Sequence, residues 1–263
     1  MLIPRIIGHR GAARAAPENT LEGLREAKRE GATWVEVDAK LTADNHVILL
    51  HDDLLDRTTS GKGAAAQATF ADIRALDAGA WLAPAWKGAK VPTLEEAVRE
   101  LVALGLNCNF EIKPCPGREN ATAEFVVREL QRLWPARGPK PLISSFAYDA
   151  LQVAYRLAPE FPRAVLVEEV PGNWQTLCEG VKAIALNPRH KTLTPEWTKA
   201  IKKAGYQILT YTVNETARAH ELFEWGVDAV FSDVPGALLK GLGEYHRHQE
   251  EAPSPELGEG SFG

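Results

Sequence analysis

Residues 36–53 read EVDAKLTADNHVILLHDD, and their two apolar segments predict a pair of strands joined by a turn. Glu36 and Asp38 are two residues apart, so on a strand their side chains point to the same side. His51 follows the second apolar run and ends that strand. A strand that reads as buried but carries two acids on one side, next to a strand that ends in histidine, indicates a functional strand end.

Short β-rich runs alternate with longer helical patterns along most of the chain. The predicted strands are 6–9, 33–41, 46–51, 107–113, 141–146, 163–169, 183–187, 207–213 and 229–233. The predicted helices are 20–30, 94–104, 120–133, 148–158, 174–181, 195–204, 215–225 and 236–248. Three helix starts carry capping signals, at Asn19 with Glu22, at Thr93 with Glu96, and at Thr194 before Pro195.

If segments 33–41 and 46–51 share one position in a sheet, the chain contains eight successive β-then-α units. This pattern predicts an α/β fold, a (β/α)8 TIM barrel, because such alternation requires parallel strands with helical crossovers. An open doubly wound sheet is the alternative. We reject it because Gly61 and Gly63 form only a lone G-x-G that follows no convincing strand.

Two segments fall outside the repeat. Residues 52–92 are too long for a simple connection, and we expect a small insertion or cap after the second barrel strand position. Residues 247–263 are rich in Glu, Pro, Ser and Gly, which predicts a disordered tail. We therefore expect residues 1–246 to form a single catalytic domain.

Composition limits the classes of function. The formal net charge of −5 argues against a nucleic-acid binder. Cys108, Cys115 and Cys178 lack a metal-binding spacing, which favours reduced thiols in a cytoplasmic protein. We expect no secretory leader, because the N-terminal MLIPRIIGHRG has no basic segment followed by a long apolar stretch. We also expect no stable membrane insertion, because no segment approaches the roughly 18 uncharged residues that a membrane helix needs. A homo-oligomer is left open.

In a barrel, the carboxyl ends of the strands meet at one rim, where catalytic groups lie. Taken singly, the charged residues at these ends could simply form ion pairs, and each histidine could be a structural residue without a catalytic role. Burying several carboxylates at one place costs free energy unless a cation or hydrogen bonds compensate their charge. Their meeting at one rim therefore indicates a hard metal ion. The groups expected to meet at this rim are His9, Glu36, Asp38, His51, Glu111 and Lys113.

The ligand types narrow the choice of metal. Three carboxylates, on Glu36, Asp38 and Glu111, favour Mg²⁺ or Ca²⁺ over zinc. With a dication, Arg10 and Lys113, such a site carries one net positive charge. That charge complements the single negative charge of a phosphodiester.

Six segments form a recognisable set: GHRGA with PENTLEG (8–23), EVDAKLTADNHVILLHDDLLDRTTSGKG (36–63), VPTLEEA (91–97), FEIK (110–113), TYTVN (210–214) and GVDAVFSDVP (226–235). In this combination and order they resemble the glycerophosphodiester phosphodiesterases, over nearly the whole chain. The resemblance implies a TIM barrel whose insertion shapes the alcohol side of the pocket. It also implies metal-dependent hydrolysis of glycerophosphodiesters, such as glycerophosphocholine or glycerophosphoethanolamine, to glycerol 3-phosphate and an alcohol.

The resemblance also implies roles for individual residues. It matches His9 and His51 to the acid–base pair, Arg10 and Lys113 to groups near the phosphate, and Glu36, Asp38 and Glu111 to the metal ligands. One histidine takes a proton from the nucleophile and the other protonates the leaving alkoxide. We take His9 as base and His51 as acid; the reverse stays open, as does water or the glycerol 2-hydroxyl as nucleophile.

Substrate preference is less constrained by the sequence. Phe146 and Tyr211 are predicted to line the pocket, although core packing would also explain them. Tyr211 stands where the family usually has Trp, and Asn45 stands in a turn that often has Gly, where Asn accepts left-handed angles. A catalytically silent phosphate-binding barrel is one alternative. A lipid-directed phosphodiesterase is another, and Trp81 and Trp86 in the insertion keep it open.

Overall fold

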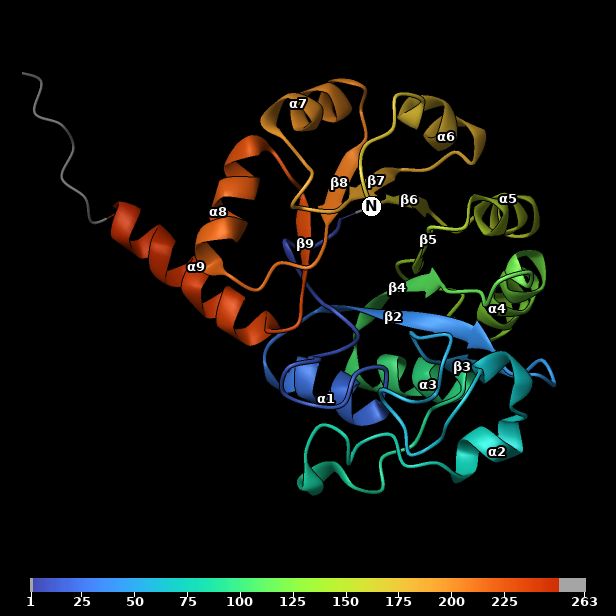
Figure 1. Ribbon diagram of the computed structural model, residues 1–263. Helices are drawn as coiled ribbons and strands as arrows, with labels where there is room; N and C mark the ends of the chain where they lie inside the picture. The colour runs from blue at the N-terminus through green and yellow to red at the C-terminus, as the bar shows by residue number, and fades with distance from the viewer. Residues whose placement is uncertain (1, 251–263) are drawn as a thin grey trace, which may run out of the picture.

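The computed structural model describes the backbone of residues 2–250 and the side chains of residues 2–243. In this part of the chain, eight parallel strands close into a barrel with helices around it, so the predicted fold is confirmed (Figure 1). The barrel strands are β1 (Ile6–Gly8), β2 (Trp34–Leu41), β4 (Asn107–Ile112), β5 (Leu142–Ser145), β6 (Arg163–Val167), β7 (Ala185–Pro188), β8 (Gln207–Thr210) and β9 (Ala229–Ser232).

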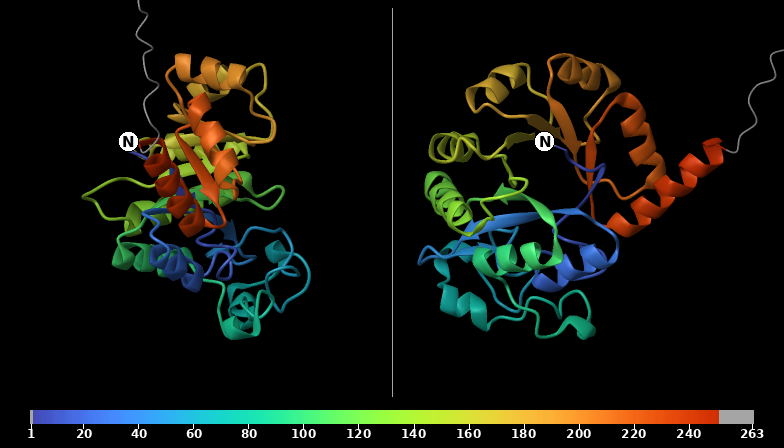
Figure 2. Two further views of the ribbon diagram at one scale, coloured as in Figure 1. Left: turned by 90° about the vertical axis from the view of Figure 1, so that its left-hand side faces the viewer. Right: turned by 180° about the vertical axis from the view of Figure 1, so that it is seen from behind.

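The helices form a ring outside the strands, which is also seen from behind the molecule in Figure 2. They are α1 (Leu21–Arg29), α3 (Leu94–Leu104), α4 (Glu119–Leu133), α5 (Tyr148–Leu157), α6 (Trp174–Gly180), α7 (Pro195–Lys203), α8 (Thr216–Trp225) and α9 (Pro235–Glu250). None of the helices within the described residues is both long and apolar enough to cross a bilayer.

Barrel closure depends on β1, which pairs in parallel with β9 on one side and β2 on the other. Ile6 lies opposite Val230, and Gly8 lies opposite Val35. The first and last strands are thereby neighbours, although more than 200 residues separate them along the chain. Their carboxyl ends reach the same rim as the ends of β2 and β4.

Alternation along the strands divides the core into two layers. Val35 and Val37 on β2 pack toward the helices, in the larger of the apolar clusters. Trp34 on the same strand lies in the cluster that fills the barrel interior with Ile7 and Phe231. Glu36 and Asp38 continue the interior side of β2 because side chains on one side recur every two residues.

The hairpin after β2 and the insertion lie to one side of the barrel. Strand β3 (Val47–Leu49) runs antiparallel to the second half of β2, and Asn45 in the turn has the left-handed φ of 64° that the sequence predicts. The segment 52–92 contains α2 (Phe70–Ala75) and two short 3-10 helices, Ala65–Gln67 and Pro84–Trp86. A separate apolar cluster lies beneath this segment, made of Ile48, Leu50, Leu55, Ala65, Ile73, Ala78 and Val91.

Two of the three predicted helix starts are confirmed. Thr93 and Glu96 form a capping box at α3, and Thr194 caps α7 ahead of Pro195. The prediction for α1 is wrong, because Thr20 is the N-cap and accepts from Gly23 N. Asn19 has a left-handed φ of 56°, and its side chain is engaged by Asp38 instead.

The C-terminal helix extends slightly beyond its predicted end, because α9 runs to Glu250 rather than to 248. Figure 2 shows α9 leading away from the ring of helices. The predicted disorder of 247–263 concerns mostly positions 251–263, which lie outside the described residues.

Candidate active site

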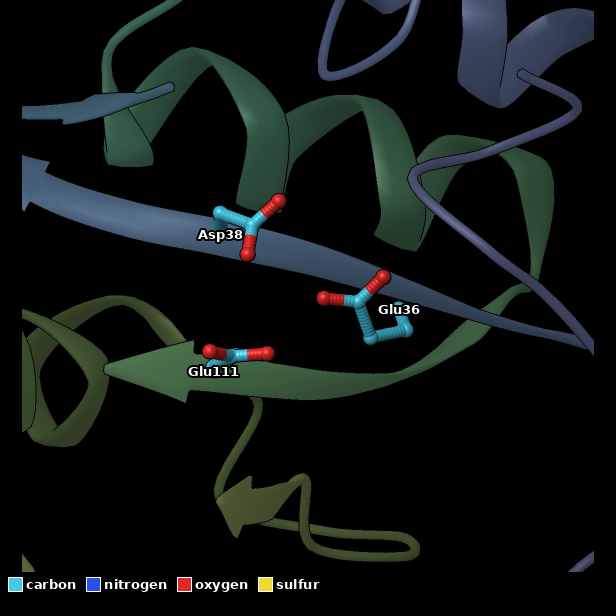
Figure 3. A group of neighbouring side chains, drawn as sticks. All are labelled: Glu36, Asp38 and Glu111. Carbon is cyan, nitrogen blue, oxygen red and sulfur yellow. The ribbon is translucent and has the colours of Figure 1, made fainter. Parts of the chain in front are cut away.

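Three carboxylates from two neighbouring strands meet at the carboxyl end of the barrel. Asp38 on β2 lies directly opposite Glu111 on β4, and Glu36 lies opposite Asn109. One oxygen from each of the three acids falls within 4.8 Å of the others (Figure 3). All three are buried, so the pattern of acids in the sequence becomes a compact cluster of carboxylate oxygens.

The protein does not provide hydrogen-bond donors for all the oxygens of this cluster. Glu36 Oε1 and Asp38 Oδ1 are buried without a hydrogen-bond partner. Burial and the neighbouring acids raise the pKa of Glu36 well above its usual value, and burial with the charge of Asp38 raises the pKa of Glu111 to about 7. Burial also opposes ionisation of Asp38, but Arg10 and other cations outweigh it and lower the pKa of that carboxyl. Unpaired oxygens and crowded like charges are what a bound dication would relieve.

Two histidines stand beside the acids, and each is held through the same ring nitrogen. His9 Nδ1 lies 2.7 Å from Asp233 Oδ1, and His51 Nδ1 lies 2.7 Å from Asp52 Oδ1. Because a carboxylate only accepts, each Nδ1 carries the hydrogen and donates it. The Nε2 atoms are then left for the site: His9 Nε2 lies 3.9 Å from Glu36 Oε2.

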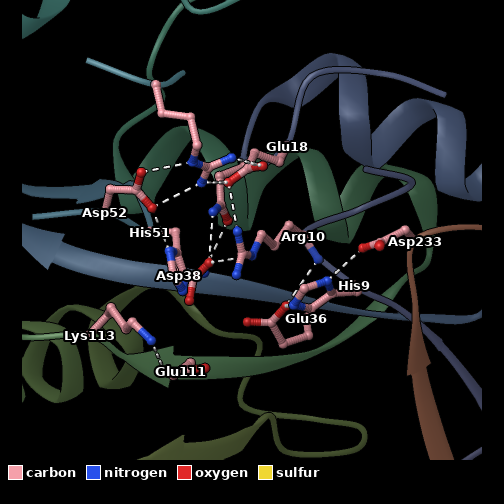
Figure 4. A network of polar contacts seen from close by, with 12 residues as sticks. His9, Arg10, Glu18, Glu36, Asp38, His51, Asp52, Glu111, Lys113 and Asp233 are labelled. Atoms are coloured by element: carbon pink, nitrogen blue, oxygen red, sulfur yellow. Dashed lines mark hydrogen bonds and ion pairs between the residues drawn. The ribbon is translucent and has the colours of Figure 1, made fainter. Parts of the chain in front are cut away.

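Two cations complete the site (Figure 4). Arg10 Nε lies 3.3 Å from Asp38 Oδ2, and Lys113 Nζ donates to Glu111 Oε1 at 2.9 Å. The Arg10 backbone also contributes, since its N–H donates to Glu36 Oε2 at 3.0 Å.

The tight loop after β1 explains the HRG sequence. Arg10 has a left-handed φ of 51°, and Gly11 follows with φ 92°. A Cβ on Gly11 would lie 2.6 Å from the backbone of Gly23 in α1, so only glycine fits this contact. The loop is thereby pressed against α1, and the Arg10 N–H faces the acid cluster.

The predicted aromatic pair lies at the mouth of the site. Phe146 and Tyr211 pack edge to face, with ring centroids 5.8 Å apart. Lys113 Nζ lies 5.2 Å from the centroid of the Phe146 ring, while the Tyr211 hydroxyl donates to Val167 O at 2.9 Å. Both rings line a cavity of about 270 Å³ together with His9, Arg10, Glu36, His51, Asn109, Glu111, Lys113, Leu166, Glu168, Thr212 and Phe231.

A larger cavity, of about 780 Å³, opens near the amino ends of β2 and β4, where Trp34 and Asn107 line it. No carboxylate or histidine is among its lining residues. His9, His51, Glu36 and Glu111 line the smaller cavity at the carboxyl ends of the strands instead.

Sequence reasoning assigned several residues of this site no role in it. Asp52 and Asp233, which hold the histidines, stood inside the quoted motifs, and Asp233 is the last residue of the predicted strand 229–233. Asn19 Nδ2 donates to Asp38 Oδ2 at 2.8 Å, and Glu18 accepts from Arg10. Asn109 Oδ1 is buried at the cavity without a partner, and its position two residues before Glu111 was the available signal.

Comparisons with known proteins agree on one family. The model of the glycerophosphoryl diester phosphodiesterase family matches residues 9–237. A glycerophosphodiester phosphodiesterase of Bacillus subtilis (strain 168) is 33% identical over 251 residues, covering 89% of this chain and 85% of that protein. The structure of an Oleispira antarctica phosphodiesterase in complex with the product sn-glycerol-3-phosphate has a TM-score of 0.89 at 37% identity, covering 92% of this chain and 97% of that one. A putative glycerophosphoryl diester phosphodiesterase from Silicibacter pomeroyi DSS-3 has a TM-score of 0.81 at 25% identity, covering 93% and 94%.

Proposed function

Because the chain belongs to the glycerophosphoryl diester phosphodiesterase family and is an enzyme of that family, we propose that it hydrolyses small glycerophosphodiesters with a divalent metal ion and two histidines. Glycerophosphocholine and glycerophosphoethanolamine are the proposed substrates, and glycerol 3-phosphate and an alcohol are the products. The observation that carries the proposal is the meeting of Glu36, Asp38 and Glu111 with their unsatisfied oxygens beside the two imidazoles.

The donor set suits a hard cation. The three acids offer only oxygen, and no cysteine lines the cavity, so Mg²⁺ or Ca²⁺ fits better than zinc. When bound, such an ion would polarise a phosphate oxygen and make phosphorus more electrophilic. Glu36, Asp38 and Glu111 would hold it.

The protein's own groups would bind and orient the diester. Arg10 and Lys113 offer their charges to the phosphate oxygens, and each is already held by an acid of the cluster. Phe146 and Tyr211 would limit the position of the organic arm. The segment 52–92 would cap the alcohol side, and residues 1–246 would act as one catalytic domain.

The two imidazoles would move the protons. His9 Nε2 takes a proton from the attacking hydroxyl, and Asp233 stabilises the imidazolium that forms. His51 Nε2 gives a proton to the departing alkoxide, and Asp52 keeps its ring in place. Figure 4 places His51 on the Asp38 side of the acids and His9 on the Glu36 side, which suits two opposite proton transfers.

A cytoplasmic location agrees with the cysteines. Cys108, Cys115 and Cys178 are all free and buried. Burial raises the pKa of the Cys178 thiol to about 12, so this group is an unreactive core residue.

The proposed function is tested by assaying glycerophosphocholine and lysophosphatidylcholine with and without a chelator. We expect hydrolysis of glycerophosphocholine, its loss with the chelator, and its recovery on adding Mg²⁺ or Ca²⁺. Hydrolysis at the same rate with and without the chelator would contradict the metal assignment. A preference for the lysolipid would favour a lipid-directed phosphodiesterase instead. Trp81 and Leu54, which are partly exposed on the insertion, are apolar residues that could contact a lipid in that case.

The pH profile of kcat/KM is expected to be bell-shaped, because the base must be neutral and the acid charged. Burial lowers the pKa of His51, and the hydrogen bond to Asp52 opposes that shift. Asp52→Asn removes a group that raises the pKa of His51, so the pKa of His51 should fall further in this variant. If His51 is the acid, the limb at high pH then moves to lower pH; movement of the limb at low pH would make His51 the base instead.

A further inference from the structure

Arg57 belongs to the polar network around the site through its hydrogen bonds to Asp52 and Glu18, and the proposed chemistry does not yet use it. It lies in the segment 52–92 and comes from the DRTT part of the sequence. Its guanidinium reaches two carboxylates at once, and each of those carboxylates holds one group of the active site.

The first carboxylate is Asp52, the partner of His51. Arg57 Nε donates to Asp52 Oδ2 at 2.7 Å, and Arg57 NH2 donates to Asp52 Oδ1 at 2.9 Å. That same Oδ1 accepts from His51 Nδ1 at 2.7 Å. The Arg57 hydrogen bonds lower the pKa of Asp52, so this group stays charged beside the imidazole.

The second carboxylate is Glu18, the partner of Arg10. Arg57 NH1 donates to Glu18 Oε2 and NH2 donates to Glu18 Oε1, both at 2.8 Å. Arg10 NH1 donates to the same Oε1 at 2.8 Å. The Glu18 side chain is only 9% exposed, so it depends on these two arginines to offset its burial.

These contacts form one continuous chain from His51 through Asp52, Arg57 and Glu18 to Arg10. We propose that Arg57 is a positioning residue that fixes the proton-transferring ring of His51 relative to the phosphate-binding guanidinium of Arg10. The proposal rests on the function proposed above. It also gives the insertion a second task, because the residue that joins the two groups belongs to that segment.

The geometry requires arginine rather than any cation. A guanidinium is planar and presents donors on two edges, so it can bind two carboxylates at fixed angles. A lysine would supply the charge at one point and could not hold both acids in this arrangement. Loss of Arg57 would leave Glu18 with Arg10 alone and would free Asp52 to turn away from His51.

The test compares kcat and KM for glycerophosphocholine in Arg57→Lys and Arg57→Met. We expect kcat to fall on the order of 10²-fold in both, the loss typical of a reacting group misplaced by about 1 Å. Affinity for Mg²⁺ or Ca²⁺, measured by calorimetry without substrate, should stay within about twofold, because Arg57 touches none of Glu36, Asp38 and Glu111. Normal kcat in Arg57→Lys would overturn the two-sided role.

Arg74 provides a matched control. It also lies in the insertion, and its NH1 and NH2 donate to Glu96 on α3 at 2.9 and 2.7 Å. Neither residue lines the cavity of the site. Arg74→Met should lower the melting temperature about as much as Arg57→Met but leave kcat unchanged. Equal loss of kcat in the two variants would reduce Arg57 to a purely structural residue.

Chemical rescue separates positioning from folding. Guanidinium ion at concentrations below denaturation should restore part of the lost kcat of Arg57→Ala. It should not raise the kcat of Arg74→Ala or of the unchanged enzyme. Similar gains in all three proteins would contradict the proposal, and an unchanged enzyme without any diesterase activity would instead contradict the proposed function.

Discussion

Alanine at His51 or His9 is expected to lower turnover of glycerophosphocholine by roughly 10²–10⁴-fold, the range for a positioned proton transfer. Each imidazole is fixed through Nδ1 by a carboxylate, so its Nε2 is aimed at the cavity rather than free to rotate. Removing either ring leaves the acids, Arg10 and Lys113 in place. The expected loss therefore falls on kcat, with a smaller change in KM.

His46 is the matched control for these two variants. It lies in the turn after β2, stacks on Phe70 and is about half exposed, outside the cavity. His46→Ala should keep normal turnover. Near-normal activity in His9→Ala or His51→Ala would remove that residue from the acid–base pair, and a loss of metal affinity in either would point to a ligand role instead.

Replacing Glu36 by glutamine is expected to abolish most of the response to metal. In the unchanged protein, Mg²⁺ or Ca²⁺ at 100 times its Kd should stabilise the fold by about 2.7 kcal/mol. Losing a residue that only hydrogen-bonds to a metal ligand typically weakens metal affinity roughly 10–100-fold. The variant lacks a ligand itself, so we expect its metal affinity to fall by at least this factor. Turnover should fall with it. The measurements are metal titration by calorimetry and the metal-dependent shift in melting temperature.

The same variant should be more stable than the unchanged protein when no metal is present. Glu36 Oε1 is buried without a partner, and burial with the neighbouring acids raises the pKa of that carboxyl. At neutral pH, folding must either bury this charge or protonate the carboxyl, and glutamine avoids both costs with little change in shape. As a control, Glu224→Gln at an exposed position on α8 should change neither the metal affinity nor the melting temperature without metal. A metal-free Glu36→Gln protein with a lower melting temperature would show that the acids do not repel one another.

The local pattern of the sequence determined the secondary structure and which acids share one side of a strand. Apolar periodicity located the strands and helices, because each element must bury one side. The two-residue spacing of Glu36 and Asp38 placed both on the same side of their strand, and Thr93 with Glu96 marked a helix start. These features depend on residues a few positions apart, so they can be read before the chain is folded.

Contacts between distant segments were decided only by the tertiary structure. Closure of the barrel brings Asp233 to His9 across 224 residues of sequence, and the insertion brings Arg57 to Glu18 across 39. Asn19, which has the spacing of a helix cap, binds Asp38 instead. No local periodicity encodes such pairs, because their partners are set by which strands become neighbours and by where the loops then pack.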